Sequence, residues 1–318
     1  MFDAVAFGEL LIDFIQNGTS AQGNNLFEAN PGGAVSNVLA MLNKLGHKTS
    51  FIGKVGKDIF GSLLRKTLND LGIDTTDLLT DEKVPTTLAF VANDETGERS
   101  FSFYRDPGAD IMFRAEELRE EAVKNTRLFH FGTLSMTHEG VREATKKALK
   151  IAKENGVLIS FDPNLRESLW NDLETARQQF DYGMQYCDIL KISDNELQWF
   201  TGEQDLEKGI AILKERYAIS LILLTLGKEG SCAYYGGRKV TVSSYPEKNV
   251  VDTTGAGDTF FGACLHCVLQ KGLKDLSDAD LKEMLSTGNA AASVVITRKG
   301  ALKVMPTPQE VEERAKLL

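Results

Sequence analysis

Short apolar runs alternate along most of the chain with longer stretches in which apolar positions recur every three or four residues. Nearly continuous apolar runs occupy Val157–Phe161, Ile189–Ile192 and Leu221–Leu226, as expected of parallel strands covered on both faces. Helical periodicity marks the stretches between them, Asp172–Tyr186 and Asp205–Tyr217. The alternation predicts an α/β fold with a doubly wound, mostly parallel sheet flanked by helices.

Two further helices are predicted near the start of the chain, each with a glycine stop. Ala34–Leu45 has an apolar stripe and is followed by Gly46, and Ile59–Leu71 is followed by Gly72. Glycine after the last helical residue is a common helix terminator because it adopts the left-handed conformation without strain.

Two hairpins interrupt this alternation. Thr87–Tyr104 reads as two strands around the turn Asp94–Gly97, and a second hairpin turns at Gly236–Gly237. The first hairpin and the strand Leu10–Ile15 have too little apolar surface for a core of their own.

We therefore expect a small β-sheet lid, built from about residues 10–33 and 86–108, on a single domain that spans residues 1–318. No linker rich in proline and serine separates a second domain.

Composition narrows the class of protein. The 318 residues are 42% hydrophobic and carry a net charge of −9, so the chain can bury a large core and has no general attraction for nucleic acid or an anionic membrane. The apolar stretch Ala218–Leu226 is far shorter than the ~20 residues that span a bilayer. Without a secretory signal, and with four scattered cysteines, the expected location is the cytoplasm.

The most informative motif is Val250–Asp258, followed by the apolar helical stretch Thr259–Leu269. It reads as strand, glycine turn and helix. Gly255 and Gly257 allow successive backbone amides to point at one anion, and the start of the helix adds its positive dipole end. Asp258 would lie beside a phosphate held there and could accept a proton from an attacking hydroxyl, although it could also merely complement the helix dipole.

Other readings of this glycine turn fail on spacing. The chain contains no GxxxxGK[ST], and Phe260 stands where a dinucleotide fingerprint needs its third glycine. GxSxG and HExxH are also absent. Phosphoryl transfer, in which the protein positions groups and stabilises charge, fits the motif better.

A second constellation is Asn30–Asn37, where Gly32 and Gly33 open the predicted helix. The amide of Asn37 needs hydrogen-bond partners when buried, which could be backbone groups or the hydroxyls of a sugar.

Together these residues carry a family resemblance. Gly32–Asn37 and Asp252–Asp258 resemble the two signature regions of the ribokinase-like (phosphofructokinase-B type) sugar kinases, and the likeness covers essentially the whole chain. Within that family, Gly8–Asp13, Tyr104–Asp110 and Asp162–Arg166 look most like fructokinases.

The resemblance implies a three-layer core with a β lid and ATP across the carboxyl ends of the strands. It implies that Asp258 is the base and that the turn forms the anion hole, made of Gly255, Ala256 and Gly257. The positions that would contact the sugar are Asp13, Gly32, Gly33, Asn37, Arg105, Asn164 and Arg166.

The resemblance also assigns the cofactor positions. Those near ATP and Mg²⁺ would be Lys191, Ser193, Glu196, Thr225, Gly227, Lys228, Gly230 and Asn289, with Glu196 nearest the Mg²⁺. Many relatives bind a monovalent cation such as K⁺, and the matching positions here are Asp252, Thr254, Val295, Arg298 and Gly300. One departure concerns Ser193, where many members have Asn. Its shorter side chain supplies no amide, although water could bridge the gap.

The expected reaction is ATP-dependent phosphorylation of fructose, at O6. Arg105 also suits a carboxylate, which leaves 2-keto-3-deoxygluconate open as an alternative substrate, and ribokinase or nucleoside kinase activity as a more distant one. A homodimer through the lid is expected, because exposed edge strands are a liability unless they are paired.

Overall fold

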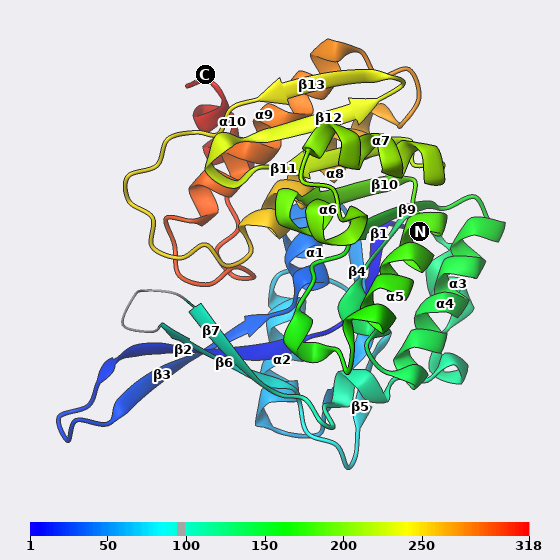
Figure 1. Cartoon of the computed structure of the whole chain (residues 1–318). Coiled ribbons are helices and arrows are strands. Elements are labelled where there is room, and N and C mark those ends of the chain that lie inside the picture. Colours follow the sequence, from blue (N-terminus) through cyan, green and yellow to red (C-terminus); the bar gives the residue numbers. More distant parts are fainter. Residues whose placement is uncertain (94–98, 318) are drawn as a thin grey trace.

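A nine-stranded sheet forms the centre of the computed structural model, which describes residues 1–93 and 99–317. Its order is β13-β12-β11-β10-β9-β8-β1-β4-β5 (Figure 1). The strands from β11 to β5 are parallel, and β12 and β13 form an antiparallel hairpin at one edge. Their bounds are β1 Phe2–Phe7, β4 Thr49–Gly56, β5 Leu78–Asp81, β8 Thr126–Gly132, β9 Leu158–Asp162, β10 Ile189–Ser193, β11 Leu221–Thr225, β12 Ser231–Tyr235 and β13 Arg238–Val242.

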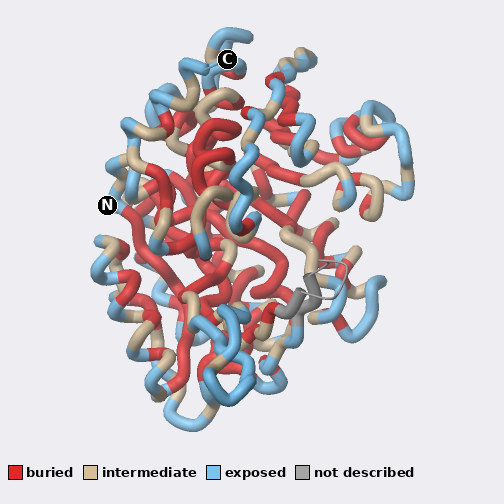
Figure 2. The backbone as a smooth tube through the Cα atoms, turned by 90° about the vertical axis from the view of Figure 1, so that its left-hand side faces the viewer, coloured by how far each residue is buried: buried red, intermediate tan, exposed pale blue. Residues whose placement is uncertain are grey.

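The central strands are apolar on both faces because helices cover both. In β1, Ala4 and Ala6 pack into one hydrophobic cluster, and Val5 and Phe7 pack into the other. This alternation follows from the two-residue period of a strand. Figure 2 shows the resulting buried interior between exposed outer turns.

Each cluster is closed by its own layer of helices. One layer contains α1 Ala34–Lys44, α2 Ile59–Asp70, α8 Ala256–Lys271, α9 Asp278–Val295 and α10 Pro308–Ala315. The other contains α3 Glu120–Lys124, α4 Glu139–Glu154, α5 Leu173–Tyr186, α6 Asp194–Thr201 and α7 Leu206–Arg216. The predicted doubly wound α/β fold is confirmed.

A separate four-stranded sheet lies beside this core, in the order β3-β2-β6-β7 (Figure 1). Its strands are β2 Leu11–Thr19, β3 Asn25–Gly32, β6 Leu88–Asn93 and β7 Arg99–Tyr104. They fall within the two segments predicted for the lid. The turn predicted at Asp94–Gly97 lies outside the described residues.

Four of the predicted helices are confirmed to within one residue at each end, whereas α8 begins three residues before the predicted Thr259 and ends two residues after Leu269. The strands of both predicted hairpins are present and pair antiparallel. Both Gly46 and Gly72 adopt positive φ after their helices, and the turn at Gly236–Gly237 joins β12 to β13.

The strand predicted immediately before Gly255 is wrong. Val250–Asp252 has no strand pairing and both valines are half exposed. Its backbone is held instead by Ile296, whose carbonyl accepts the amides of Val251 and Asp252. An apolar pair resembles the end of a strand in a sequence, but here it is too short to join the sheet.

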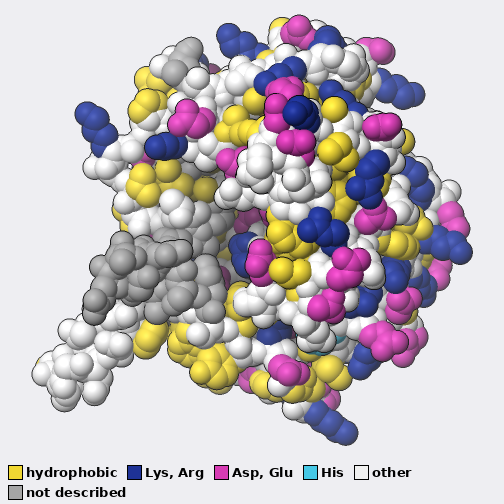
Figure 3. All heavy atoms as spheres, viewed as in Figure 1, with side chains coloured by type: hydrophobic (Ala, Val, Ile, Leu, Met, Phe, Trp, Pro, Cys, Tyr) yellow, Lys and Arg dark blue, Asp and Glu magenta, His cyan; other side chains and the backbone are white. Residues whose placement is uncertain are grey.

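On the molecular surface, acidic and basic side chains are intermixed over the face shown in Figure 3. Among the residues that the model describes, a search for a helix with the length and apolarity needed to cross a bilayer found none.

Candidate active site

A cavity of about 470 Å³ opens where the central parallel strands end and α8 begins. The carboxyl end of a parallel sheet is the usual place for a ligand in this architecture. The cavity is lined by Glu9, Leu11, Asp13, Gly33, Ala34, Asn37, Phe103, Leu134, Asn164, Arg166, Lys191 and the run Thr253–Asp258.

Asp258 lies on the first turn of α8 and is held from two sides. The Nδ2 of Asn37 donates to one carboxylate oxygen at 2.8 Å, and the Nδ2 of Asn164 lies 3.4 Å from the other. Burial raises the pKa of Asp258, while the Asn37 hydrogen bond and the charge of Lys191 act in the opposite direction. The carboxylate is therefore fixed in orientation at the cavity wall.

The glycine turn in front of Asp258 depends on the absence of side chains. Gly255 has φ 73° and precedes the first residue of α8, and a Cβ on it would lie 2.3 Å from the Cβ of Ala301. A Cβ on Gly257 would lie 3.1 Å from the Nζ of Lys191. Amides in the first turn of a helix have no partner within the helix, so this turn can receive an anion beside a lysine.

Two further acidic groups that line the cavity have raised pKa values. Glu9 is buried, and removal from water raises its pKa to about 7 although its carboxylate accepts the amide of Ala34 at 2.6 Å. Asp13 has its pKa raised to about 7 by removal from bulk water and by the charges of Asp252 and Asp258, against the opposing charge of Arg166.

Asn37 contributes a further acceptor beside Asp258. Its Oδ1 is buried without a hydrogen-bond partner among the described residues, whereas its Nδ2 binds Asp258. A buried acceptor without a donor is destabilising unless a ligand supplies one.

A buried ion pair crosses the floor of the cavity. The Nζ of Lys191 lies 2.9 and 3.1 Å from the two carboxylate oxygens of Asp162. Burial raises the pKa of Asp162 to about 7. Burial opposes the charge of Lys191, but its acidic neighbours Asp162 and Glu196 outweigh this and raise its pKa.

Glu196 reaches the same region from α6. Its carboxylate accepts the amide of Leu165 at 2.8 Å and both the amide and the hydroxyl of Ser193, at 2.9 and 2.8 Å. Burial opposes ionisation, but Lys191 and these amides lower its pKa. Ser193 therefore acts as the N-cap of α6 and as a direct partner of Glu196.

Arg105 does not line the cavity. Its side chain is buried, with Nε 2.8 Å from Asp110 Oδ2, NH1 3.0 Å from the hydroxyl of Thr137 and NH2 2.8 Å from the carbonyl of Leu134. Gly32 lies next to the cavity wall, where a Cβ on it would be 2.3 Å from the carboxylate of Asp13. The other sugar-contacting positions of the resemblance all line the cavity.

The positions expected around the nucleotide form a less enclosed region. Thr225, Gly227, Lys228 and Gly230 follow one another at the end of β11, where Gly227 and Lys228 are exposed. Asn289 is buried on α9 and bonds to Ser231 and to the carbonyls of Val242 and Ser243, so it ties α9 to the β12–β13 edge.

The positions expected around a monovalent cation lie in two adjoining loops. The carboxylate of Asp252 accepts the amides of Thr254 at 2.9 Å and of Gly300 at 3.0 Å. The loop that holds Gly300 begins at Val295, the last residue of α9. The guanidinium of Arg298 binds the carbonyl of Val304 and the carboxylate of Glu310.

Several residues of the cavity were not predicted as site residues. Glu9 lies in the Gly8–Asp13 motif, and a charged residue just after β1 is a signal from which its place in the cavity could have been predicted. Phe103 adjoins the quoted Tyr104–Asp110 motif. Leu134 stands between Thr133 and Ser135, where the sequence carries no local mark of a site.

Comparison with known proteins shows the family to which this chain belongs. The family model described as pfkB family carbohydrate kinase matches residues 1–308. Fructokinase-1 of Zea mays is 40% identical over 310 residues, covering 96% of this chain and 95% of its own, and fructokinase-2 of Solanum lycopersicum is 38% identical over 309 residues, covering 96% and 94%.

Solved structures give the same result. A fructokinase from Xylella fastidiosa with bound ATP has a TM-score of 0.91 at 30% identity, covering 100% of this chain and 99% of its own. A fructokinase from Vibrio cholerae O395, solved with fructose, ADP and calcium ion, has a TM-score of 0.88 at 30% identity, with 99% of each chain covered. This chain belongs to the pfkB family of carbohydrate kinases and is a sugar kinase, a phosphotransferase with an alcohol group as acceptor.

Proposed function

We propose that this sugar kinase transfers the γ-phosphoryl group of ATP to O6 of fructose, with Asp258 as the base. The observation that carries the proposal is the position of Asp258, fixed by Asn37 and Asn164 directly behind the Gly255–Gly257 turn. The fructokinases among its relatives support fructose as the acceptor.

In the proposed reaction, the O6 hydroxyl attacks the γ-phosphorus and the bond between that phosphorus and the β–γ bridging oxygen breaks. ADP leaves with the bridging oxygen, and the hydroxyl proton passes to the Asp258 carboxylate. The turn amides and Lys191 stabilise the charge that spreads over the transferred group, which is the main protein contribution to phosphoryl transfer. Asp13 and the free Oδ1 of Asn37 accept sugar hydroxyls.

A divalent ion would be held mainly by the nucleotide. Within residues 1–93 and 99–317, no group of three or more His, Cys, Asp or Glu side chains is placed to hold a metal. Glu196 presents a single carboxylate, already bonded to Ser193 and Leu165, which suits a Mg²⁺ that keeps its waters and phosphate ligands. When bound, the ion neutralises charge on the phosphates.

The Asp252 and Gly300 loops offer a carboxylate and backbone carbonyls. Oxygen donors of this kind suit a hard cation such as K⁺, and a fructokinase from Vibrio cholerae O395 was solved with fructose, ADP and potassium ion.

A neutral acceptor is favoured by the state of Arg105. Its charge is already matched by Asp110, and both side chains are 3% exposed. An acid sugar such as 2-keto-3-deoxygluconate would have to rely on Arg166, the arginine that lines the cavity.

We further propose that the small sheet acts as a lid and pairs with that of a second copy. Its edge strands are β3 and β7. Leu26 and Phe27 on β3 are 48% and 41% exposed, and Tyr104 on β7 is 66% exposed. An exposed apolar edge of this kind is normally covered. Elution of the purified chain at dimer mass is expected, and monomer mass at assay concentration would contradict this.

The decisive test is a substrate panel with coupled detection of ADP. Fructose should give the highest kcat/KM, ahead of 2-keto-3-deoxygluconate, ribose and nucleosides, and NMR of the product should place the phosphate on O6. A higher kcat/KM for another sugar, or a phosphate on O1, would contradict the proposal. The same assay without sugar reports ATP hydrolysis as the background.

A further inference from the structure

A second hollow of about 220 Å³ lies beside the active-site cavity. It is formed where the chain leaves β7 and where the segment after β9 passes, which includes the short helix η4 Glu167–Leu169. Its lining residues are Phe103, Arg105, Asp106, His138, Ser168, Leu169, Trp170 and Asn171. Phe103 also lines the cavity, so a single aromatic ring is common to both walls.

One wall of this hollow is formed by Trp170, which is 8% exposed. Its indole Nε1 is buried and has no hydrogen-bond partner among the described residues. Trp170 therefore contributes apolar ring surface to the hollow rather than a hydrogen-bond donor.

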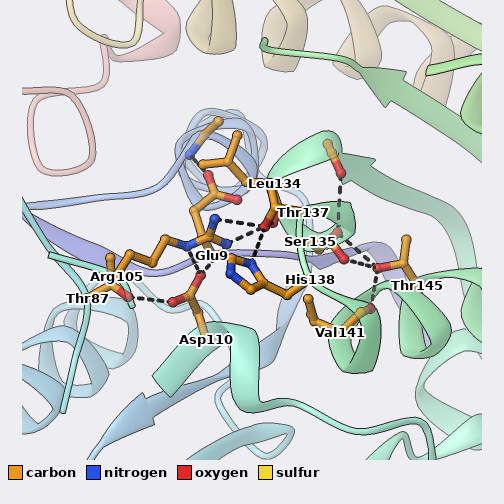
Figure 4. Close-up of polar contacts among 12 residues, drawn as sticks. Glu9, Thr87, Arg105, Asp110, Leu134, Ser135, Thr137, His138, Val141 and Thr145 are labelled. Carbon is orange, nitrogen blue, oxygen red and sulfur yellow. Dashed lines mark hydrogen bonds and ion pairs between the residues drawn. The ribbon is translucent and has the colours of Figure 1, made fainter. Parts of the chain in front are cut away.

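His138 adds a polar group to the lining, and it takes part in the hydrogen-bond network in Figure 4. The Leu134 carbonyl is within reach of the Thr137 hydroxyl at 3.0 Å and of Arg105 at 2.8 Å. The hydroxyl oxygen accepts from Arg105 and lies 3.0 Å from Nδ1 of His138. Its single proton can go to the carbonyl or to Nδ1, so Nε2 of a neutral His138 accepts in one tautomer and donates in the other.

Charge decides the class of ligand. Arg105 is matched by Asp110 at 2.7 Å in a buried pair, and Asp106 adds an exposed carboxylate to the lining. Burial and the nearby Arg105 charge lower the pKa of His138, so this imidazole is neutral at pH 7. The described part of the hollow thus offers no unmatched cation for an anionic ligand.

Neutral hydroxyl groups fit these walls because each hydroxyl both donates and accepts. Ser168 and Asn171 can donate to them, Asp106 can accept from them, and His138 Nε2 can do one or the other according to its tautomer. Phe103 and Trp170 add flat apolar surfaces of the kind that pack against the C–H face of a sugar ring. The volume lies below the roughly 300 Å³ at which sites for larger ligands begin, so one ring fits better than a nucleotide.

We propose that this hollow is a second binding site for a neutral monosaccharide, next to the acceptor site and separated from it by Phe103. The inference goes beyond the proposed function because it does not depend on which sugar is phosphorylated. The site holds sugar without performing chemistry, since Asp258 and the glycine turn line the other cavity.

The test uses Trp170 as its own reporter. The chain has two tryptophans, and Trp199 packs on Phe180 and Arg177 at another place, so Trp199→Phe leaves Trp170 as the single emitter. Titration of this full-length variant with D-fructose, without ATP, should give two separate changes in emission.

Blocking the hollow should remove one of these changes. Ser168 is exposed, so Ser168→Phe can fill the hollow without disturbing the core. This variant should abolish the emission change that has the weaker affinity for fructose, or shift its midpoint at least tenfold. The change that has the stronger affinity should remain. Ser220, also exposed, precedes β11 at the opposite end of the sheet, and Ser220→Phe should keep both changes.

Three results would overturn the proposal. The first is a single change in emission during the fructose titration. The others are persistence of the weaker-affinity change in Ser168→Phe, and loss of that change in Ser220→Phe as well as in Ser168→Phe. Failure of the proposed function is recognised separately, by the absence of ADP release with fructose. In that case a weaker change sensitive to Ser168→Phe still supports the second site.

Discussion

The regions that we propose for the sugar acceptor and for the nucleotide are built in different ways. On the proposed acceptor side, Glu9, Asn37 and Asp258 are buried and held by hydrogen bonds to named partners. On the proposed nucleotide side, Gly227 and Lys228 lie outside the cavity lining and are exposed, and the chain before the glycine turn has no strand pairing. A side that is fixed before the ligand arrives contributes more to the transition state than one with mobile surface groups. We therefore expect large effects of substitution on the acceptor side and small ones on the nucleotide side.

The largest expected effect is that of Asp258→Asn. The change keeps the shape of the side chain but removes the base, so kcat for the sugar substrate should fall by about 10²–10⁴-fold. Steady-state kinetics measure it, with Asp77→Asn as the control. Asp77 is also buried, but it pairs with Arg119 just before β5, away from the cavity. Turnover of Asp258→Asn like that of the wild type would remove Asp258 from the mechanism.

Asp13→Asn should come next. A carboxylate that accepts sugar hydroxyls contributes about 1.5–3 kcal/mol, so the KM for the sugar should rise about 10–100-fold. The KM for ATP should change less than twofold, because Asp13 lies on the acceptor wall with Glu9 and Arg166. Equal changes in both constants would show that the two sides are not separable.

The pH dependence of the two KM values provides a third way to separate the acceptor side from the nucleotide side. The pKa of Asp13 is raised to about 7 by removal from bulk water, so the group gains its proton as the pH falls through 7 and then accepts hydroxyls poorly. The KM for the sugar should rise about fivefold from pH 7 to pH 6 and level off above pH 8. The KM for ATP should not follow this profile.

The variant Asp13→Asn is the matched control for the pH experiment. Its KM for the sugar should no longer show this step between pH 8 and pH 6, because the amide does not titrate. A step of the same size in the variant would assign the titration to another group, such as Glu9 or Asp162, whose pKa values are also raised to about 7.

The smallest expected effect is that of Lys228→Ala. The side chain is exposed, and exposed charge interactions contribute about 0.2–1 kcal/mol. The KM for ATP should rise at most about fivefold, and it should rise less as ionic strength increases. A loss of tenfold or more in kcat would mean that this loop closes over the phosphates and is as organised as the acceptor side.

The sequence alone predicted what depends on local pattern. Helix ends at Gly46 and Gly72 and the apolar parallel strands follow from periodicity and from single residues with positive φ. The strand predicted at Val250–Asp252 failed because two apolar residues do not specify whether a neighbouring strand is available. The acidic residue and glycine turn of the site could be read because they lie within seven consecutive positions.

Other parts of the site depend on contacts that are distant along the chain. Arg105 looked available to a ligand, but its guanidinium is taken up by Asp110, Thr137 and the carbonyl of Leu134. Thr137 is 32 positions away in the sequence. Pairings of this kind are set by topology, so neither the burial of Arg105 nor the hollow beside it could be predicted from the motif.

The hydrogen bond between Asn37 and Asp258 joins residues 221 positions apart. Ribosomes deliver a chain from its N-terminus, so Asn37, which we propose to contact the sugar, is synthesised long before Asp258, the proposed base. Ala301, against which the glycine turn packs, emerges later still. If Asp258 is the base, a nascent chain cannot consume ATP until synthesis has passed residue 258, which is in the last fifth of the sequence.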